Sequence, residues 1–473
     1  MDRRDFFCWL RNGLAGAAVA TLMRRDGTAR ASEPGDDRAA GPHFPPRATR
    51  AIHICLAGAM SQVDSFDYKP GLIAAHGQSL VSPTRPDVFF GQVGRLRRPD
   101  WDFKRRGESG LWVSELFPHI AGVADELTFI RSMVAETSNH TPATFRENSG
   151  FRLNGFPSLG SWMSYGLGSE ADDLPAFVVI PDSRELPAGG SINWSNGFLP
   201  ARHQGVVIRP RGEPIDDLFP ATPISDGAES ATRGLVRSMN RRHFDRHPGD
   251  DTLSARIRGY ELAARMQASV PRVAEISGED AATLDLYGVN RPETDDFGRS
   301  CLIARRLLER GVRFVQLFSG GTFGSPRRNW DGHEDMRRNH GQEALRIDLP
   351  VAGLLRDLRR RGLLDDTLVL FTTEFGRTPF TQSAADVVGA GRDHNQYGFT
   401  VWMAGAGLRG GIAHGSTDEV GWKAAEDPVT WPDFHATVLH LLGIDHTRLT
   451  HYHNGIQRRL TNVHGSVIKP ILA

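Results

Sequence analysis

Acidic and imidazole side chains recur beside strand-like segments of this 473-residue chain. The stretch LVLFTTEFGRTP (368–379) shows the pattern most clearly, because an apolar run typical of a buried strand ends at Glu374. A buried carboxylate without a partner costs several kcal/mol, so Glu374 is expected to bind a cation or to pair with Arg377 in a structural ion pair. Gly376 and Pro379 are expected to prevent regular continuation of the strand.

Further strand-like runs are also flanked by polar side chains. These are Ser61, Asp64, Asp67, Asn139, His140, Thr141, Asp331, His333, Asp393 and His394. Carboxylates and imidazoles that converge from several elements are the ligands that a divalent cation needs. Each residue also has a structural interpretation: Asp64 and Asp67 as turn or cap residues, Asp331 and His333 as loop surface, His140 as a hydrogen-bonded histidine. Because all of these residues lie beside the ends of strand-like runs, a shared metal site is favoured.

The elements that must position these residues alternate along the chain. Short, continuously apolar runs predict strands at 51–58, 127–133, 176–181, 312–320, 367–374 and 399–405. Helical periodicity predicts helices at 253–268, 296–310, 341–361 and 433–442. Continuous apolarity indicates strands covered on both faces, and hence an α/β sandwich with a largely parallel sheet. In such folds ligands bind at the carboxyl ends of the strands.

Residues 1–31 resemble a twin-arginine export signal, with paired arginines, a short apolar stretch and a small-residue cleavage site. The alternative is a basic disordered tail. The apolar stretch is shorter than the roughly 20 residues of a membrane span. We expect export by the twin-arginine translocase to the periplasm or another extracytoplasmic location, with no stable membrane span. A linker follows at 32–48, and 49–473 forms a single domain, with an irregular insertion at about 182–250.

Composition narrows the class of protein. The chain is 39% hydrophobic and 24% charged, with a formal net charge of zero, so nothing predicts a nucleic acid or an anionic membrane as partner. Outside the predicted signal, Cys55 and Cys301 lie in apolar runs and are expected to be buried free thiols. No CxxC motif and no Cys/His spacing typical of zinc sites is present.

Several long phrases carry a family resemblance, among them LAGAMSQVDSFDYKP, PSLGSWMSYGLG, LPAFVVI, NWDGH, RGLLDDTLVLFTTEFGRTP, GRDHNQYGFTVWMAGAGLRGG and DFHATVLHLLGID. They resemble an exported, sulfatase-like branch of the alkaline-phosphatase-like superfamily, catalogued as domain of unknown function 1501. The resemblance covers nearly all of residues 50–473. It implies a three-layer α/β/α sandwich and one or two divalent ions (Zn, Mn, Ca or Mg), and it implies a small-molecule or glycan sulfate or phosphate ester as substrate.

The resemblance also implies roles for single residues. It assigns metal binding to Asp64, Asp331, His333, Glu374 and His394. The sulfatase nucleophile falls at His140, so the formylglycine precursor is absent. Where relatives have Asp-His-Gly or Asp-Asn-Gly, this chain has Glu374-Phe375-Gly376, and Phe375 cannot bind metal.

Two functions remain open at this level. The first is a metal-dependent hydrolase of sulfate or phosphate esters, in which cations polarise the ester and fixed positive charge stabilises the transition state. Arg377 and Asn139 would hold the anionic group, and Asp393 is a further candidate for substrate binding. The nucleophile would be His140, Thr141, Ser61 or metal-bound water. The second is a catalytically degenerate member that binds a glycan or an anion, with Trp194, Asn196 and Arg202 on its recognition surface.

Overall fold

The computed structural model describes residues 41–473 except 83–84, 217, 219–224, 247–250 and 323–326. The signal peptide predicted over 1–31 and most of the linker predicted over 32–48 lie outside the described residues. Among those residues no helix combines the length and the apolarity needed to cross a bilayer. Cys55 and Cys301 are buried free thiols, as predicted.

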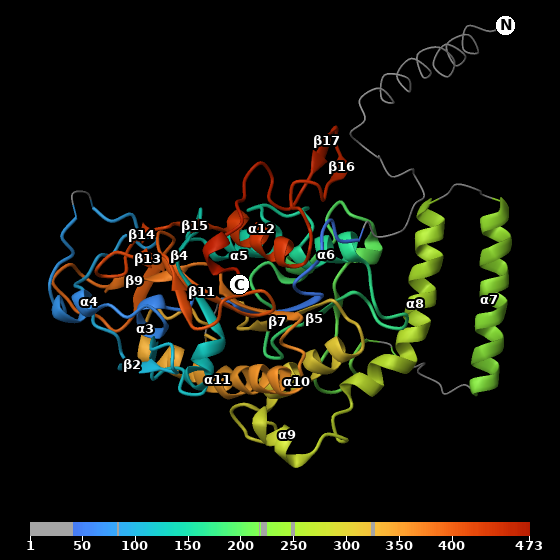
Figure 1. Ribbon diagram of the computed structural model, residues 1–473, viewed down its shortest axis with the longest axis horizontal. Helices are drawn as coiled ribbons and strands as arrows, with labels where there is room; N and C mark the ends of the chain where they lie inside the picture. Colours follow the sequence, from blue (N-terminus) through green and yellow to red (C-terminus); the bar gives the residue numbers. More distant parts are fainter. Residues whose placement is uncertain (1–40, 83–84, 217, 219–224, 247–250, 323–326) are drawn as a thin grey trace, which may run out of the picture.

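A nine-stranded sheet forms the centre of the molecule (Figure 1). Its strands run in the order β12 (Ile412–His414), β4 (Leu127–Val134), β11 (Phe399–Gly405), β8 (Thr367–Thr373), β1 (Arg50–Leu56), β7 (Phe314–Ser319), β5 (Phe177–Ile180) and β6 (Val206–Val207), while β15 (Val429–Thr430) pairs with β4. All pairings in it are parallel except those of β11 with β4 and β8. The six predicted strands and the largely parallel sheet are confirmed.

Helices cover both faces of the sheet, which confirms the three-layer prediction (Figure 1). One face carries α10 (Asp295–Glu309), α11 (Met336–Arg360) and the 3-10 helix η1 (Ile120–Glu126), and the other carries α5 (His140–Ser149), α6 (Leu159–Leu167) and α12 (Trp431–Leu441). α11 begins five residues before the predicted start at 341, because the Asp335 side chain accepts a hydrogen bond from the Arg338 amide and caps it.

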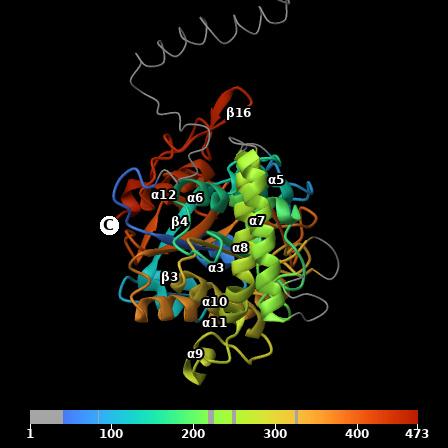
Figure 2. The ribbon, with the colours of Figure 1, turned by 90° about the vertical axis from the view of Figure 1, so that its right-hand side faces the viewer.

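The insertion over 182–250 is less irregular than predicted. Its first half contains only the short elements η2 (Gly190–Trp194), η3 (Ala201–His203) and β6, but its second half forms the long helix α7 (Asp226–Arg246). The helix escaped prediction because most of its described side chains are exposed, so it has no strong apolar stripe. It lies beside α8 (Asp251–Ala274), which corresponds to the helix predicted at 253–268 (Figure 2).

Smaller elements complete the chain. They are α3 (Gln62–Ser65), α4 (Pro70–Ala74), α9 (Ala281–Leu286), η4 (Lys469–Ile471) and the strand pairs β2 (Phe103–Arg106) with β3 (Leu111–Ser114), β13 (Ser416–Thr417) with β14 (Ala424–Glu426), β16 (His451–His453) with β17 (Ile456–Arg458), and β9 (Gly376–Thr381) with β10 (Arg392–Asn395).

The pair β9 and β10 corrects one expectation. Gly376 and Pro379 do not prevent regular structure: the chain leaves the central sheet after β8 and resumes as β9, which pairs with β10 and forms an isolated bridge from Phe380 to Leu96. Proline is tolerated there because the register shifts between Arg392 and His394, opposite it, and no ladder hydrogen bond from its nitrogen is required.

The topology brings the predicted site residues to one edge of the sheet. Strands β1, β4, β7 and β8 point the same way, so their carboxyl ends meet at one edge, and β11 begins there because it runs in the opposite direction. The segments that follow β1, β4, β7 and β8 and the segment that precedes β11 therefore come together, as expected for a ligand site in an α/β fold.

Asp348 on α11 links this helix to η1, and it makes stability depend on pH. Its buried carboxylate accepts hydrogen bonds from the amides of His119 (2.8 Å) and Ile120 (2.7 Å). Burial raises its pKa to about 6, although the two amide bonds oppose the shift. The folded state therefore binds the proton more tightly than the unfolded chain, whose Asp pKa is near 3.8.

We predict that wild type gains up to about 3 kcal/mol of stability relative to Asp348→Asn as the pH falls from 7 to 4. Asparagine keeps an oxygen acceptor for the two amides but does not titrate. Urea unfolding of both proteins at several pH values measures the difference. If the difference in free energy of unfolding between the two proteins stays constant with pH, the raised pKa of Asp348 is contradicted.

Candidate metal centre

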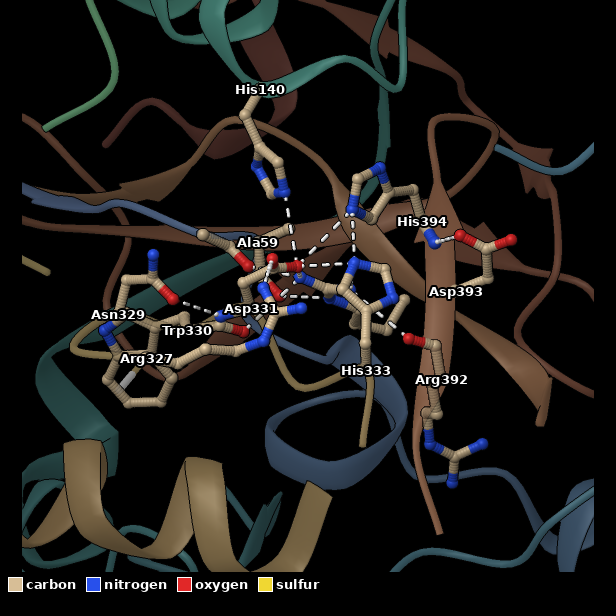
Figure 3. Close-up of polar contacts among 12 residues, drawn as sticks. Ala59, His140, Arg327, Asn329, Trp330, Asp331, His333, Arg392, Asp393 and His394 are labelled. Carbon is tan, nitrogen blue, oxygen red and sulfur yellow. Dashed lines mark hydrogen bonds and ion pairs between the residues drawn. The ribbon is translucent and has the colours of Figure 1, made fainter. Parts of the chain in front are cut away.

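Three imidazoles converge on one carboxylate oxygen at the edge of the sheet (Figure 3). Asp331 Oδ1 lies 2.7 Å from His333 Nε2, 3.3 Å from His140 Nε2 and 3.4 Å from His394 Nε2. His140 begins α5, His394 lies on β10, and Asp331 and His333 lie in the segment between β7 and α11. All four side chains are buried, and one ligand atom of each lies within 4.8 Å of the others.

Each imidazole is oriented by an oxygen on its other nitrogen. Nδ1 of His140 lies 2.6 Å from Glu374 Oε1, Nδ1 of His333 lies 2.5 Å from Gln382 Oε1, and Nδ1 of His394 lies 2.5 Å from the carbonyl oxygen of Ser138. Oxygens of these kinds accept hydrogen bonds, so each Nδ1 carries the hydrogen. Each Nε2 then presents a lone pair toward the cluster, which is the arrangement found for histidines that bind metals.

The spacing of these lone pairs fits a cation. The Nε2 atoms of His333 and His394 are 2.8 Å apart, and two acceptors at this distance repel unless a positive charge lies between or beside them. Three imidazole nitrogens and one carboxylate oxygen form a donor set typical of zinc and related transition metals. These four residues therefore fit a divalent cation on their own chemistry.

Arg377 supports the carboxylate of Asp331. The fully buried guanidinium donates to Asp331 Oδ1 (2.5 Å), to the carbonyl oxygens of Gly58 (2.5 Å) and Ala59 (2.8 Å), and to that of Arg392 (3.3 Å), and its Nη1 lies 3.3 Å from His333 Nε2. The carbonyl and carboxylate oxygens account for four of the five N–H groups of an arginine. Arg377 was expected to hold an anionic substrate, but in this arrangement only the Nη1 hydrogen that faces His333 is not directed at a protein oxygen.

Asp331 is strongly acidic because of this setting. Burial by itself would raise its pKa, but Arg377 and the three histidines outweigh burial and hold the pKa far below its usual range. Arg327 donates to the second carboxylate oxygen, Oδ2, and the same guanidinium forms a two-bonded pair with Glu334 (both 2.8 Å). Asp331 is therefore ionised and fixed from both sides.

Glu374 lies behind His140. Its Oε1 accepts hydrogen bonds from the Gly58 amide (2.9 Å) and from His140 Nδ1 (2.6 Å), and its side chain is fully buried. Its partner is thus His140, and the expected structural pair with Arg377 does not form. Burial lowers the pKa of His140, but the neighbouring carboxylates of Asp331 and Glu374 outweigh this and raise it.

The turn after β1 holds in place Glu374, which supports His140, and Arg377, which supports Asp331. Gly58 and Ala59 have φ values of 113° and 67°, and a Cβ on Gly58 would lie 2.6 Å from the Trp330 amide nitrogen. Positive φ is costly for alanine and recurs at functional sites, where the surrounding structure enforces it. Here the strained turn aims one amide at Glu374 and two carbonyls at Arg377.

Asp64 does not join the cluster. Its carboxylate pairs with Arg392 (2.8 Å) and accepts hydrogen bonds from the Ser61 hydroxyl (2.5 Å) and from the Asp100 amide (3.0 Å). Burial opposes ionisation of Asp64, but Arg392 and the hydrogen bonds lower its pKa. Ser61, a candidate nucleophile, is fully buried and donates to Asp64.

The remaining predicted site residues are not among the four that converge at Asp331. Asp393 accepts hydrogen bonds from the amides of His394 (2.7 Å) and Phe90 (3.0 Å), so it lies beside the cluster. Asn139 is exposed at the start of α5, and Thr141 follows His140 within that helix. Trp194 is buried, 5.6 Å from the ring of Phe318. Arg202 lies near Tyr165 and His203: burial raises the pKa of Tyr165 against the opposing charge of Arg202, whereas burial and Arg202 together lower the pKa of His203 to about 3.

Two aromatic rings and two polar groups at the site were not predicted. Phe89 packs 4.8 Å from the ring of His394, and Phe90 packs 4.9 Å from the ring of His333, yet both remain about half exposed. They lie in a segment without regular structure far from the motifs in sequence. Arg327 and Gln382 were also missed, and no spacing relative to the cluster residues signals any of the four.

The comparisons with known proteins point to one family. The family model described as "Protein of unknown function (DUF1501)" matches residues 48–472. No curated protein matches the chain significantly. The predicted family is confirmed by this match.

Solved structures similar to this chain include the lipoteichoic acid synthase LtaP from Listeria monocytogenes (10% identity, TM-score 0.38, 90% of this chain and 78% of that chain). They also include the PsFucS1 sulfatase from Pseudoalteromonas sp. (11% identity, TM-score 0.34, 87% and 74%) and a protein in the alkaline phosphatase superfamily from Vibrio parahaemolyticus (10% identity, TM-score 0.36, 86% and 70%). At these TM-scores the likenesses carry no inference about activity.

Gly391 allows β10 to approach the segment that carries His333. A Cβ there would lie 1.6 Å from the His333 carbonyl oxygen, so Gly391→Ala must move backbone and separate His333 from His394. We predict a loss of stability of about 1–3 kcal/mol together with weaker metal binding.

Thermal unfolding and metal content per chain measure both effects. The control is Gly234→Ala on α7, where nothing lies within 4 Å of an added Cβ and where alanine should stabilise the helix by about 1 kcal/mol. If the two variants have equal thermal stability and equal metal content, the close approach at Gly391 has no role in the site.

Proposed function

The chain belongs to the DUF1501 family, and from the geometry of its metal centre we propose that it is a metal-dependent hydrolase of phosphate or sulfate esters. The observation that carries the proposal is the convergence of the Nε2 atoms of His140, His333 and His394 on Asp331 Oδ1. The ester class is supported by the resemblance of the sequence to the alkaline-phosphatase-like superfamily.

These four residues would hold the cation, and a bound divalent ion supplies Lewis-acid polarisation of the ester oxygen and a more acidic water. The three nitrogens favour a zinc-class or manganese ion over calcium or magnesium, which prefer all-oxygen sites. Glu374, Gln382 and the Ser138 carbonyl fix the imidazole orientations, and Arg377 and Arg327 fix the carboxylate.

The nucleophile we infer is water. His140 has both ring nitrogens in contact with carboxylates, and the Ser61 hydroxyl is bonded to Asp64. Neither is free to attack in this arrangement, and Thr141 has no described base partner. In hydrolysis the water oxygen bonds to phosphorus or sulfur, the ester bond breaks, and the leaving alcohol takes a proton.

Phe89 and Phe90 support a substrate with an apolar or ring-shaped part. Their rings contact two imidazoles of the cluster and are about half exposed, so a ligand approaching from this side meets aromatic surface beside the cation. Sugar and aryl rings pack well against such surfaces. The export signal expected over 1–31 supports a periplasmic location for this reaction.

A separate observation, the set of contacts that Arg377 makes, favours a second function. The guanidinium of Arg377 is directed at Asp331 and at carbonyl oxygens of the protein, so it is not placed to stabilise a transition state. This would suit a member that binds a glycan or an anion through its cation without turnover. Metal binding without hydrolysis would favour this function over the first.

The loss of Asp331 tests the centre. We predict that wild type retains at least one divalent cation per chain and hydrolyses p-nitrophenyl phosphate or p-nitrophenyl sulfate. Asp331→Asn and His394→Ala should lose the cation and lower kcat/KM about a thousandfold, the equivalent of about 4 kcal/mol. Elemental analysis and steady-state kinetics measure these outcomes.

The control for these variants is His414→Ala, on the edge strand β12 and outside the cluster, which should match wild type. Full activity in metal-free Asp331→Asn, or wild type that holds no stoichiometric metal, would refute the proposed function.

The loss of charge at Glu374 tests the support of His140. Glu374→Gln keeps the shape of the side chain but weakens the acceptor for Nδ1, so we predict a 10- to 100-fold weaker metal affinity, roughly the usual effect of such partners. Competition with a chromophoric chelator measures the affinity. An unchanged dissociation constant would mean that the contact between Glu374 and His140 does not tune the ligand.

A further inference from the structure

A second group of metal-binding side chains lies inside the protein, separate from the centre described above. His53 and Cys55 are on β1, and Glu147 is on α5, two turns after His140. Cys55 Sγ lies 3.3 Å from His53 Nε2, and one ligand atom from each of the three residues lies within 4.8 Å of the others. Thr372 on β8 joins them: its hydroxyl lies 2.7 Å from His53 Nε2 and bonds to Glu147.

The surroundings of this group leave polar atoms without partners. His53, Cys55 and Glu147 are each at most 2% exposed. The amide of Gln316 contacts Cys55 Sγ through its Nε2 (3.4 Å), and its Oε1 is buried without a hydrogen-bond partner; the same holds for Nδ1 of His53, the ring nitrogen opposite the one that faces Cys55. Buried polar atoms of this kind are rare in folded proteins and call for a ligand, an ion or a water to explain them.

The absence of a paired basic side chain gives the second argument. No ion pair joins Glu147 to a lysine or arginine within the described part of the chain. The Glu147 carboxyl and the Cys55 thiol thus share a buried site with His53 and without a paired lysine or arginine.

A divalent cation matches this site in charge and in ligand type. A thiolate and a carboxylate carry two negative charges, and a neutral imidazole adds a nitrogen, so one divalent ion makes the group neutral. Zinc bonds to sulfur and nitrogen at about 2.3 and 2.1 Å, which places the two ligand atoms about 3.6 Å apart in a tetrahedral site. The observed 3.3 Å between Sγ and Nε2 is close to this spacing.

We propose that His53, Cys55 and Glu147 bind a second, internal divalent cation of the zinc class. The ion joins β1 to α5, the helix that carries His140, and so holds one ligand of the outer centre in place. The three side chains are at most 2% exposed, so the role we propose for the ion is structural. The proposal does not depend on the hydrolase function, because it concerns a different set of residues.

Cobalt is the probe that distinguishes this site from the outer one. The outer centre contains no sulfur, whereas cobalt(II) bound to Cys55 produces a thiolate-to-cobalt charge-transfer absorption. The full chain is produced in cobalt-supplemented medium, because a buried ion is taken up as the protein folds. We expect wild type to show the absorption and to hold at least two cations per chain.

Three variants assign the absorption. Cys55→Ser should lose it together with one cation per chain, whereas Cys301→Ser should keep both, because Cys301 is an equally buried free thiol outside the group. Asp331→Asn should lose a cation from the outer centre and keep the absorption. A missing thiolate-to-cobalt absorption would therefore contradict the internal site, whereas missing hydrolysis or missing metal at the outer centre would contradict the proposed function.

The wild-type spectrum decides the question even where Cys55→Ser does not fold. A folded wild-type protein without the absorption overturns the proposal and leaves a neutral hydrogen-bonded group of Glu147, Thr372 and His53. An absorption that survives in Cys55→Ser, or that disappears in Cys301→Ser, overturns the assignment to this site.

Discussion

The carboxylate of Asp331 is the interaction on which the rest of the site depends. Three imidazoles direct Nε2 toward one of its oxygens, and Arg377 and Arg327 bind its two oxygens from opposite sides. A buried charge of this kind persists only where positive partners surround it, because its desolvation is costly. The strained turn at Ala59, the β9–β10 pair and the loop after β7 are arranged so that those partners arrive together.

The same principle distinguishes the buried charges of this protein from one another. Asp64 is balanced by Arg392, which also donates to the carbonyl oxygens of Thr378 and Pro379, so this pair fastens the segment after β1 to β9. Asp331 is balanced by guanidinium groups and still attracts three imidazoles. Glu147 contacts the Thr372 hydroxyl and Cys55 contacts His53 instead, and Glu147 forms no ion pair with a lysine or arginine in the part of the chain that the structure describes. The buried acids thus range from structural ion pair to candidate metal ligand according to the positive charge available to each.

Sequence reasoning found the elements because their signals are local. Continuous apolar runs, such as those of β8 and β11, predict strands covered on both faces, and the observed bounds agree closely. It failed for α7, whose exposed side chains leave no apolar stripe, and for β9, whose regularity comes from pairing with β10 rather than from its own residues. Glu374 and Asp64 were both assigned to the metal because the sequence shows where acids occur but not which partners they have.

The family could be read from the long sequence phrases that resemble it, and the α/β architecture and the sheet edge at which acids and histidines gather could be read from apolar periodicity and the order of the elements. Which of those side chains share one oxygen is fixed only in the folded chain. Phe89 and Gln382 reach the cluster from segments that no motif marks, and His53 and Glu147 meet across β1 and α5. Such contacts join residues far apart in the chain, and their distances are set by packing rather than by spacing.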